Sequence, residues 1–161
     1  MRIAIDRSVI RGLIAAAVFL VCANEAAAQG PPAPSCTIST TAVSFGNYNV
    51  FSATPTDSTG SVIFNCNAQA TSIRVTLSSG VSASFSPRTL RKGSESLAYN
   101  LYLDAARTSI WGDGGGGTAQ YGPTNPANNQ NVTVVVYGRI PAGQDVTAGA
   151  YSDTVVATIV F

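Results

Sequence analysis

Few side chains in this sequence could carry out acid–base or nucleophilic chemistry. The sequence contains no histidine, which excludes Ser-His-Asp and Cys-His nucleophiles. Beyond residue 28 the remaining acidic residues fall mostly at predicted turns: Asp57, Glu95, Asp104, Asp113, Asp145 and Asp153. A glycoside hydrolase needs two carboxyl groups that face each other across a cleft, and no motif indicates such a pair here. We therefore predict no catalytic residue and keep a two-carboxylate hydrolase only as a minor hypothesis.

Cofactor and metal sites are not expected either. The glycine run at 114–117 lacks the Gly-Lys-Ser/Thr ending and the following helix of a phosphate-binding loop. Without histidine, two distant cysteines do not complete a zinc site. Trp111 and Tyr121 flank the glycine run and are candidates for stacking on a sugar or contacting a surface. Trp111 could equally fill one end of the core, and Asp104 and Arg107 are expected to form a local ion pair.

The first residues have the layout of a secretory signal peptide. Three arginines precede an apolar run at 12–23, and small residues at 26–28 provide a cleavage site. The run of about 12 residues is too short to span a bilayer, which needs about 20. We predict a signal peptide at 1–28, a Pro-rich extension at 29–35 and one domain at 36–161, with no transmembrane segment in the mature chain.

The mature chain keeps two cysteines and almost no net charge. Cys22 lies inside the predicted signal, so Cys36 and Cys66 remain. In an oxidising compartment they are expected to form one disulfide, worth roughly 3–4 kcal/mol for a loop of about 30 residues. Removing the signal leaves equal numbers of basic and acidic residues. Such a surface does not attract nucleic acid and opposes self-association only weakly.

Short alternating segments recur along the mature chain, separated by Gly, Ser, Asn and Pro. They are predicted strands at 38–45, 61–67, 73–77, 97–103, 131–138 and 151–161. No window has a convincing helical period, and the longest irregular segment is 112–130. This pattern predicts an all-β sandwich.

The last predicted strand alternates large apolar residues with smaller or polar ones. Val155, Ala157, Ile159 and Phe161 share one face of it. No charged residue follows them to discourage pairing with another chain. Because an exposed strand of this kind is an aggregation hazard, we expect it to have a partner.

Several segments, taken together and in order, resemble the spore coat protein U domain family, which also describes subunits of archaic chaperone–usher pili. They are 99–113, 136–143, 148–154, the element at 45–48, Cys36, Cys66 and the apolar final strand. The resemblance implies an immunoglobulin-like β-sandwich that lacks one strand. A periplasmic chaperone, and then a neighbouring subunit, would supply that strand beside Val155, Ala157, Ile159 and Phe161.

The same resemblance implies further partners and a location. The chain would be a non-enzymatic subunit of an extracellular fibre or coat that supports adhesion and biofilm, assembled through an outer-membrane usher. One departure concerns the segment 29–35, where Pro31, Pro32 and Pro34 prevent strand donation. We hypothesise that the subunit accepts a strand but gives none, as at a fibre end or in a coat. The alternative is a monomeric secreted sugar- or surface-binding sandwich that uses Trp111 and Tyr121.

Overall fold

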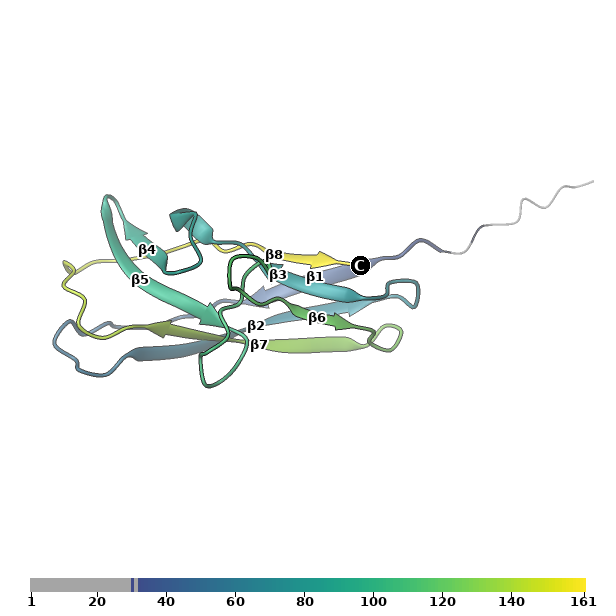
Figure 1. Ribbon diagram of the computed structural model, residues 1–161, viewed down its shortest axis with the longest axis horizontal. Coiled ribbons are helices and arrows are strands. Elements are labelled where there is room, and N and C mark those ends of the chain that lie inside the picture. Colours follow the sequence, from purple (N-terminus) through teal and green to yellow (C-terminus); the bar gives the residue numbers. More distant parts are fainter. Residues whose placement is uncertain (1–29, 31) are drawn as a thin grey trace, which may run out of the picture. The chain divides into compact units, whose positions relative to one another are not determined.

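The computed structural model of the protein describes residues 30 and 32–161 (Figure 1). The predicted signal peptide at 1–28 lies outside the described residues, as do residues 29 and 31. The described part is built from strands and one short 3₁₀ turn. In chain order these are β1 (Cys36–Thr41), β2 (Thr56–Cys66), β3 (Ile73–Leu77), η1 (Gly80–Ser82), β4 (Arg88–Lys92), β5 (Glu95–Tyr102), β6 (Tyr121–Thr124), β7 (Asn131–Ile140) and β8 (Ala157–Val160).

Two antiparallel sheets pack face to face. One sheet has the strand order β1-β2-β7-β5-β4, and the other has the order β6-β3-β8. Figure 1 shows β3 and β8 lying over β2 and β7. This arrangement confirms the predicted all-β sandwich. Neighbouring strands are far apart in sequence, since β2 pairs with β7 from Thr56↔Ile140 to Asn65↔Asn131.

Alternation with a period of two builds the core. Every second residue is buried in β2 from Val62 to Cys66 and in β7 from Val134 to Ile140, because successive side chains of a strand point to opposite faces. Ile73 and Val75 of β3 meet them from the second sheet and are fully buried. The apolar side chains of the two sheets therefore form one continuous core.

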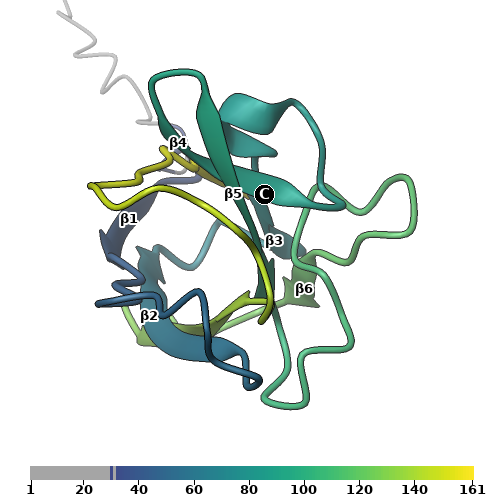
Figure 2. The same ribbon diagram turned by 90° about the vertical axis from the view of Figure 1, so that its left-hand side faces the viewer.

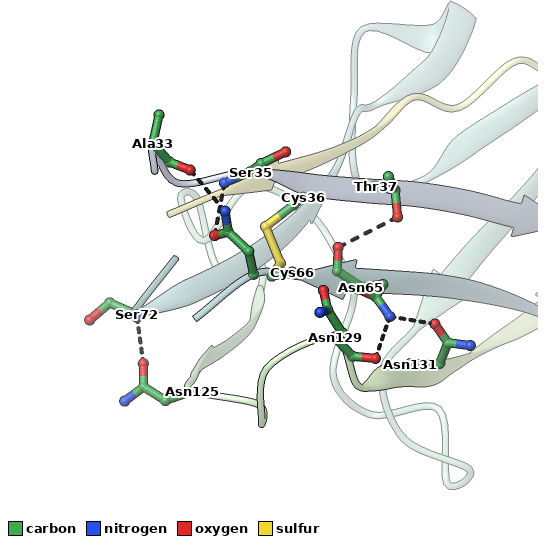
Figure 3. The surroundings of a disulfide bond; sticks show 11 residues. Ala33, Ser35, Cys36, Thr37, Asn65, Cys66, Ser72, Asn125, Asn129 and Asn131 are labelled. Carbon is green, nitrogen blue, oxygen red and sulfur yellow. Dashed lines mark hydrogen bonds between the residues drawn. A yellow bond between two sulfur atoms is a disulfide. The ribbon is translucent and has the colours of Figure 1, made fainter. Parts of the chain in front are cut away.

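The predicted disulfide joins the start of β1 to the end of β2, as Figure 3 shows. Cys36 and Cys66 are cross-strand partners, which confirms the pairing expected from the cysteine count. The Asn67 side chain donates to the Ala33 carbonyl and accepts from the Ser35 N–H. These bonds continue the β1 edge beyond the disulfide, so residues 33–35 are held in line with β1.

The predicted elements differ from the structure in four places. The strand predicted at 151–161 is regular only over β8, Ala157–Val160. The strand predicted at 38–45 ends at Thr41, because the chain then crosses the inner face of the five-stranded sheet. The strands β4 and β6 were not predicted. β4 carries Arg88 and Arg91, which hide its alternation, and β6 contains Pro123, which normally argues against a strand.

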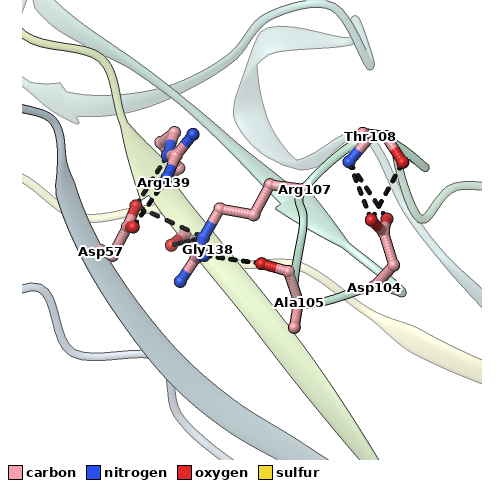
Figure 4. Close-up of polar contacts among 7 residues, drawn as sticks. All are labelled: Asp57, Asp104, Ala105, Arg107, Thr108, Gly138 and Arg139. Carbon is pink, nitrogen blue, oxygen red and sulfur yellow. Dashed lines mark hydrogen bonds and ion pairs between the residues drawn. The ribbon is translucent and has the colours of Figure 1, made fainter.

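The expected ion pair between Asp104 and Arg107 is wrong. The Asp104 carboxylate accepts hydrogen bonds from the backbone N–H groups of Thr108 and Ser109 and so closes its own turn. Arg107 instead reaches the neighbouring strands, where its Nε lies 3.3 Å from Asp57 and donates to the Gly138 carbonyl. Figure 4 shows Asp57 between the guanidinium groups of Arg107 and Arg139. This long-range cluster fastens the 104–108 turn to β7.

Candidate functional site

Two strand edges lack a partner on one side of the sandwich. β1 pairs only with β2, and β8 pairs only with β3 within residues 30 and 32–161. Ser78 donates its N–H to the Val156 carbonyl, so alternate residues of this segment point their backbone groups toward β3. By the geometry of antiparallel pairing, Val155, Ala157 and Ile159 direct their N–H and C=O groups to the open edge.

A core-facing side chain on the opposite edge is also uncovered. Ile38 of β1 lies directly across from Phe64 of β2, so both side chains point to the inner face of the sheet. Phe64 is 1% exposed, whereas Ile38 is 37% exposed. An apolar side chain that faces the core but remains exposed indicates that a covering element is missing there.

A groove runs along this open side. It has a larger part of about 1030 Å³ between the segments 42–51 and 146–153 and a smaller part of about 290 Å³ that continues to Ala157. Its floor consists of core residues from both sheets: Val62, Leu77, Leu90, Leu97, Tyr99, Val136 and Ile140. Figure 2 views the protein from the end that carries the 42–51 and 146–153 segments.

The first wall of the groove, residues 42–51, is held by close packing on two glycines. A Cβ at Gly138 would lie 2.7 Å from the side chains of Val43 and Phe45, and one at Gly60 would lie 2.5 Å from the Thr41 carbonyl oxygen. Both positions therefore need glycine if the chain is to cross the sheet this closely. Tyr48 adds a second attachment, because its hydroxyl donates to the Pro141 carbonyl and accepts from the Gln144 N–H.

The second wall, residues 144–157, is fastened to the β4–β5 hairpin. Thr147 and Tyr151 donate their hydroxyl hydrogens to the Glu95 carboxylate, and Lys92 donates to the Ala148 carbonyl. The hydroxyl donors, Thr147 first, lower the pKa of Glu95 to about 2. Ser152 exchanges two backbone hydrogen bonds with Arg91. The wall is thus fixed at several points, although little of it is regular strand.

A polar group interrupts the apolar floor near the middle of the groove. Tyr99, which is 4% exposed, donates its hydroxyl hydrogen to the Asp153 carboxylate at 2.6 Å. Burial, and then this hydrogen bond, raise the pKa of Tyr99, so the phenol remains a donor. Deeper in the core, Arg88 is fully buried and donates to Ser78, Asn100 and Trp111.

The residues singled out from the sequence lie in different surroundings. Val155 and Ala157 line the groove, and Ile159 packs against the core beside them. Phe161, 49% exposed, lies at the end of this row. Sequence reasoning missed the 42–51 wall, Tyr99 and Asp153. The apolar spacing of Val43 and Phe45 was visible, but nothing local indicated that they leave the sheet.

The proposed surface contact at Trp111 is wrong. Trp111 is completely buried, and its indole N–H donates to the Val75 carbonyl at 2.9 Å. It fills the core, which was the alternative interpretation. Tyr121 is half-buried and packs edge-on against Phe64. The two aromatic residues therefore do not form an exposed pair.

Other kinds of site find little support in the part of the chain that the structure describes. There, no three His, Cys, Asp or Glu residues gather in a way that could hold a metal ion. The same residues include no helix long and apolar enough to cross a membrane.

The fold and the groove together define an all-β sandwich with one open side, and comparisons with known proteins agree with this class. A chain of the chaperone–tip adhesion subunit pre-assembly complex CsuC–CsuE, from the archaic chaperone–usher Csu pili of Acinetobacter baumannii, has a similar fold. The TM-score is 0.52 at 22% identity, and the match covers 80% of this chain and 40% of that chain. This chain therefore spans about two fifths of the length of the solved chain.

The sequence comparisons are more specific. The family model of the Spore Coat Protein U domain matches residues 23–158. Protein U of Myxococcus xanthus is 37% identical over 133 residues, which are 74% of this chain and 71% of that protein. The chain belongs to the spore coat protein U domain family.

Proposed function

We propose that this chain is a non-enzymatic structural subunit of an exported coat or archaic chaperone–usher pilus, and that its groove accepts a β-strand from another chain. The uncovered, inward-facing Ile38 on the unpaired edge strand β1, together with the unpaired edge of β8, carries this proposal. A strand that follows the groove and continues along the β1 edge would cover Ile38 and pair with the backbone groups of Val155, Ala157 and Ile159. Backbone hydrogen bonds would supply affinity and alternate side chains would fill the floor, as in β-augmentation.

Family membership and the signal-like residues 1–28 support the wider setting. After cleavage, the extension 29–35 and the domain 36–161 would enter the periplasm, where a chaperone would lend the first strand. An outer-membrane usher would then pass the subunit to the cell surface, where a neighbouring subunit replaces the chaperone strand. The assembled coat or fibre would support adhesion and biofilm.

The N-terminal extension makes this subunit an acceptor only. Residues 29–35 contain three prolines and no large apolar side chain. Proline lacks the N–H that a strand contributes to its neighbours, so the extension would leave another subunit's groove empty. We therefore place the subunit at a fibre end or in a coat. A self-sufficient sugar-binding module is disfavoured because Trp111 is buried.

The proposal can be tested by giving the chain its own ninth strand. An Asn-Gly turn after Phe161, followed by nine alternating Val and Thr residues, would run antiparallel to β8. In extended form the added segment spans roughly 30 Å. We expect the fused chain to accumulate in the periplasm without a chaperone and to unfold in urea at a higher midpoint than the unfused chain.

Two matched controls sharpen this test. Shifting the added strand by one residue turns its valines outward, so only one of the two registers should stabilise the chain. Replacing three inward valines by aspartate should abolish the gain. An unfused secreted chain that is monomeric, and as resistant to urea as the better fusion, would contradict the proposal.

A further inference from the structure

We infer that the groove contains a polar subsite at the Asp153 carboxylate, and that this subsite selects and aligns a donor strand with one inward-facing, hydrogen-bond-donating side chain. The inference rests on the proposed function, since a strand lying in the groove is what would meet Asp153. It adds a partner specificity that an apolar groove would lack.

The position of Asp153 is the first step. It is among the residues that line both parts of the groove, so a strand that follows the groove must pass it. The floor on either side is apolar, with Leu97 and Ile140 in the larger part and Leu77 and Val136 in the smaller. Asp153 is the one charged residue among the described residues that line the two parts, and it lies between these two apolar stretches of the floor.

The carboxylate is held in place by the protein itself. Its Oδ1 accepts the N–H groups of Val81, at 2.8 Å, and Thr154, at 2.7 Å. Its Oδ2 accepts the hydroxyl hydrogen of Tyr99 at 2.6 Å. A carboxylate offers about four acceptor positions, and these three bonds leave one on Oδ2 without a partner among the described residues. Gly80 packs against the carboxylate, because a Cβ there would lie 2.1 Å from Oδ2, so a group that enters the groove would reach Oδ2 from the side away from Gly80.

Within the described residues Asp153 forms no ion pair. The ion pairs found among the described residues use Asp57 or Glu95 as the acid. The nearby buried cation, Arg88, directs its donors to Ser78, Asn100 and Trp111. Asp153 is half-buried in the open groove and is therefore still partly hydrated.

A donor strand would remove this hydration, and the chemistry of the covering side chain then decides the outcome. An apolar side chain would bury the carboxylate without replacing its water, which is costly. An acidic side chain would add like-charge repulsion. An N–H or O–H group would complete the fourth acceptor position. Because a slip of two residues would move that group away from Asp153, the subsite would also set the register of the donor.

Synthetic nine-residue peptides can test this on the secreted chain, residues 29–161, refolded from urea in their presence. The parent peptide has valine at five inward positions and threonine or lysine at the outward ones. At each of the three central inward positions, valine is replaced in turn by asparagine or by the isosteric aspartate. At one of these positions we expect asparagine to bind at least tenfold more tightly than aspartate, and more tightly than valine.

The outcomes separate the two proposals. If no peptide binds, the groove does not accept a strand, and both the proposed function and this inference fail. If peptides bind but valine is best at all three positions, the inference fails and the proposed function survives. A tighter asparagine peptide at one position supports both.

Variants locate the effect. In Asp153→Asn the asparagine and aspartate peptides should bind with nearly equal affinity. Asp113→Asn, which alters a carboxylate of the glycine loop, should leave the preference for the asparagine peptide unchanged. A preference that persists in Asp153→Asn would overturn the assignment. If Asp153→Asn fails to fold, Tyr99→Phe provides the second test. It frees a further acceptor position on Oδ2 and should widen the preference for asparagine.

Discussion

At the scale of single residues, two glycines determine where the first wall of the groove can lie. Gly60 and Gly138 face residues 41–45 across a space too small for a Cβ. At Gly60 the obstacle is the Thr41 backbone oxygen, which cannot rotate away as a side chain can. The absence of one methyl group at each position thus allows the chain to leave β1 and cross the sheet.

Gly60→Ala should therefore destabilise the protein by about 1–3 kcal/mol, the usual cost of overpacking. Urea unfolding of the chain fused to its own added strand would measure the difference. Gly115→Ala is the matched control, because its nearest neighbouring atom would lie 3.3 Å away. Equal unfolding midpoints for the two variants would show that the wall does not depend on Gly60.

At the scale of elements, the second wall depends on its attachment to the β4–β5 hairpin. Glu95 accepts hydrogen bonds from Thr147 and Tyr151, and these donors favour its ionised form. Its pKa of about 2 lies below the ordinary value of 4.5. The stabilisation is therefore complete above about pH 4.5 and is lost as the pH falls toward 2.

Glu95→Gln should lower stability at pH 7, and its difference from the parent protein should shrink between about pH 4.5 and 2. Urea midpoints of the two proteins across this range would measure the change. Comparing the two proteins cancels the contributions of Asp57, Asp104 and Asp113, whose pKa values are also lowered. A difference that stays constant with pH would mean that Glu95 acts only by packing.

The disulfide is a second long-range attachment between elements, because it fixes the start of the edge strand β1 to the end of β2. Cys36 and Cys66 are 30 residues apart. Replacing both with serine should cost roughly 3–4 kcal/mol in the chain-entropy model, measured as a lower urea midpoint. Amide hydrogen exchange should also quicken along β1 before it does so along β7. Uniform acceleration in all strands would indicate that the disulfide does not act on β1 in particular.

At the scale of the whole molecule, assembly with other subunits depends on two features. The groove is the proposed acceptor of a strand, and the segment 29–35 lacks the features of a donor strand. The described residues 32–35 leave at the end of the fold where the chain also ends (Figure 1). A strand grafted at this end and inserted into the next subunit makes a head-to-tail contact, which does not close and so extends into a fibre.

Replacing residues 29–35 by nine alternating Val and Thr residues should therefore convert the secreted chain into one that polymerises. Size-exclusion chromatography and electron microscopy would detect the fibres. The control is the same graft with proline at two inward positions, and the protein that carries it should not form fibres. Polymerisation of the parent chain through its own 29–35 segment would contradict the acceptor-only assignment.

Local patterns were enough to predict much of this protein. Alternation in β3, β5 and β7 predicted strands, and the cysteine count predicted the Cys36–Cys66 bond. The first signal is local, because a strand's burial repeats every two residues. The second is arithmetic, because the two cysteines of the predicted mature chain have one way to pair. The same alternation placed Val155 and Ala157 on an inward face, and the structure puts them on the wall of the groove.

The groove itself was decided by tertiary structure. Tyr99 and Asp153 are 54 residues apart, and Val43 meets Gly138 only because β2 and β7 bring distant segments together. Burial of Trp111 likewise follows from its place between the sheets and not from its neighbours in sequence. The amino-acid pattern thus determined which residues form strands and which face is apolar. Only long-range packing decided which edge stays open and which polar group lies on the floor beneath it.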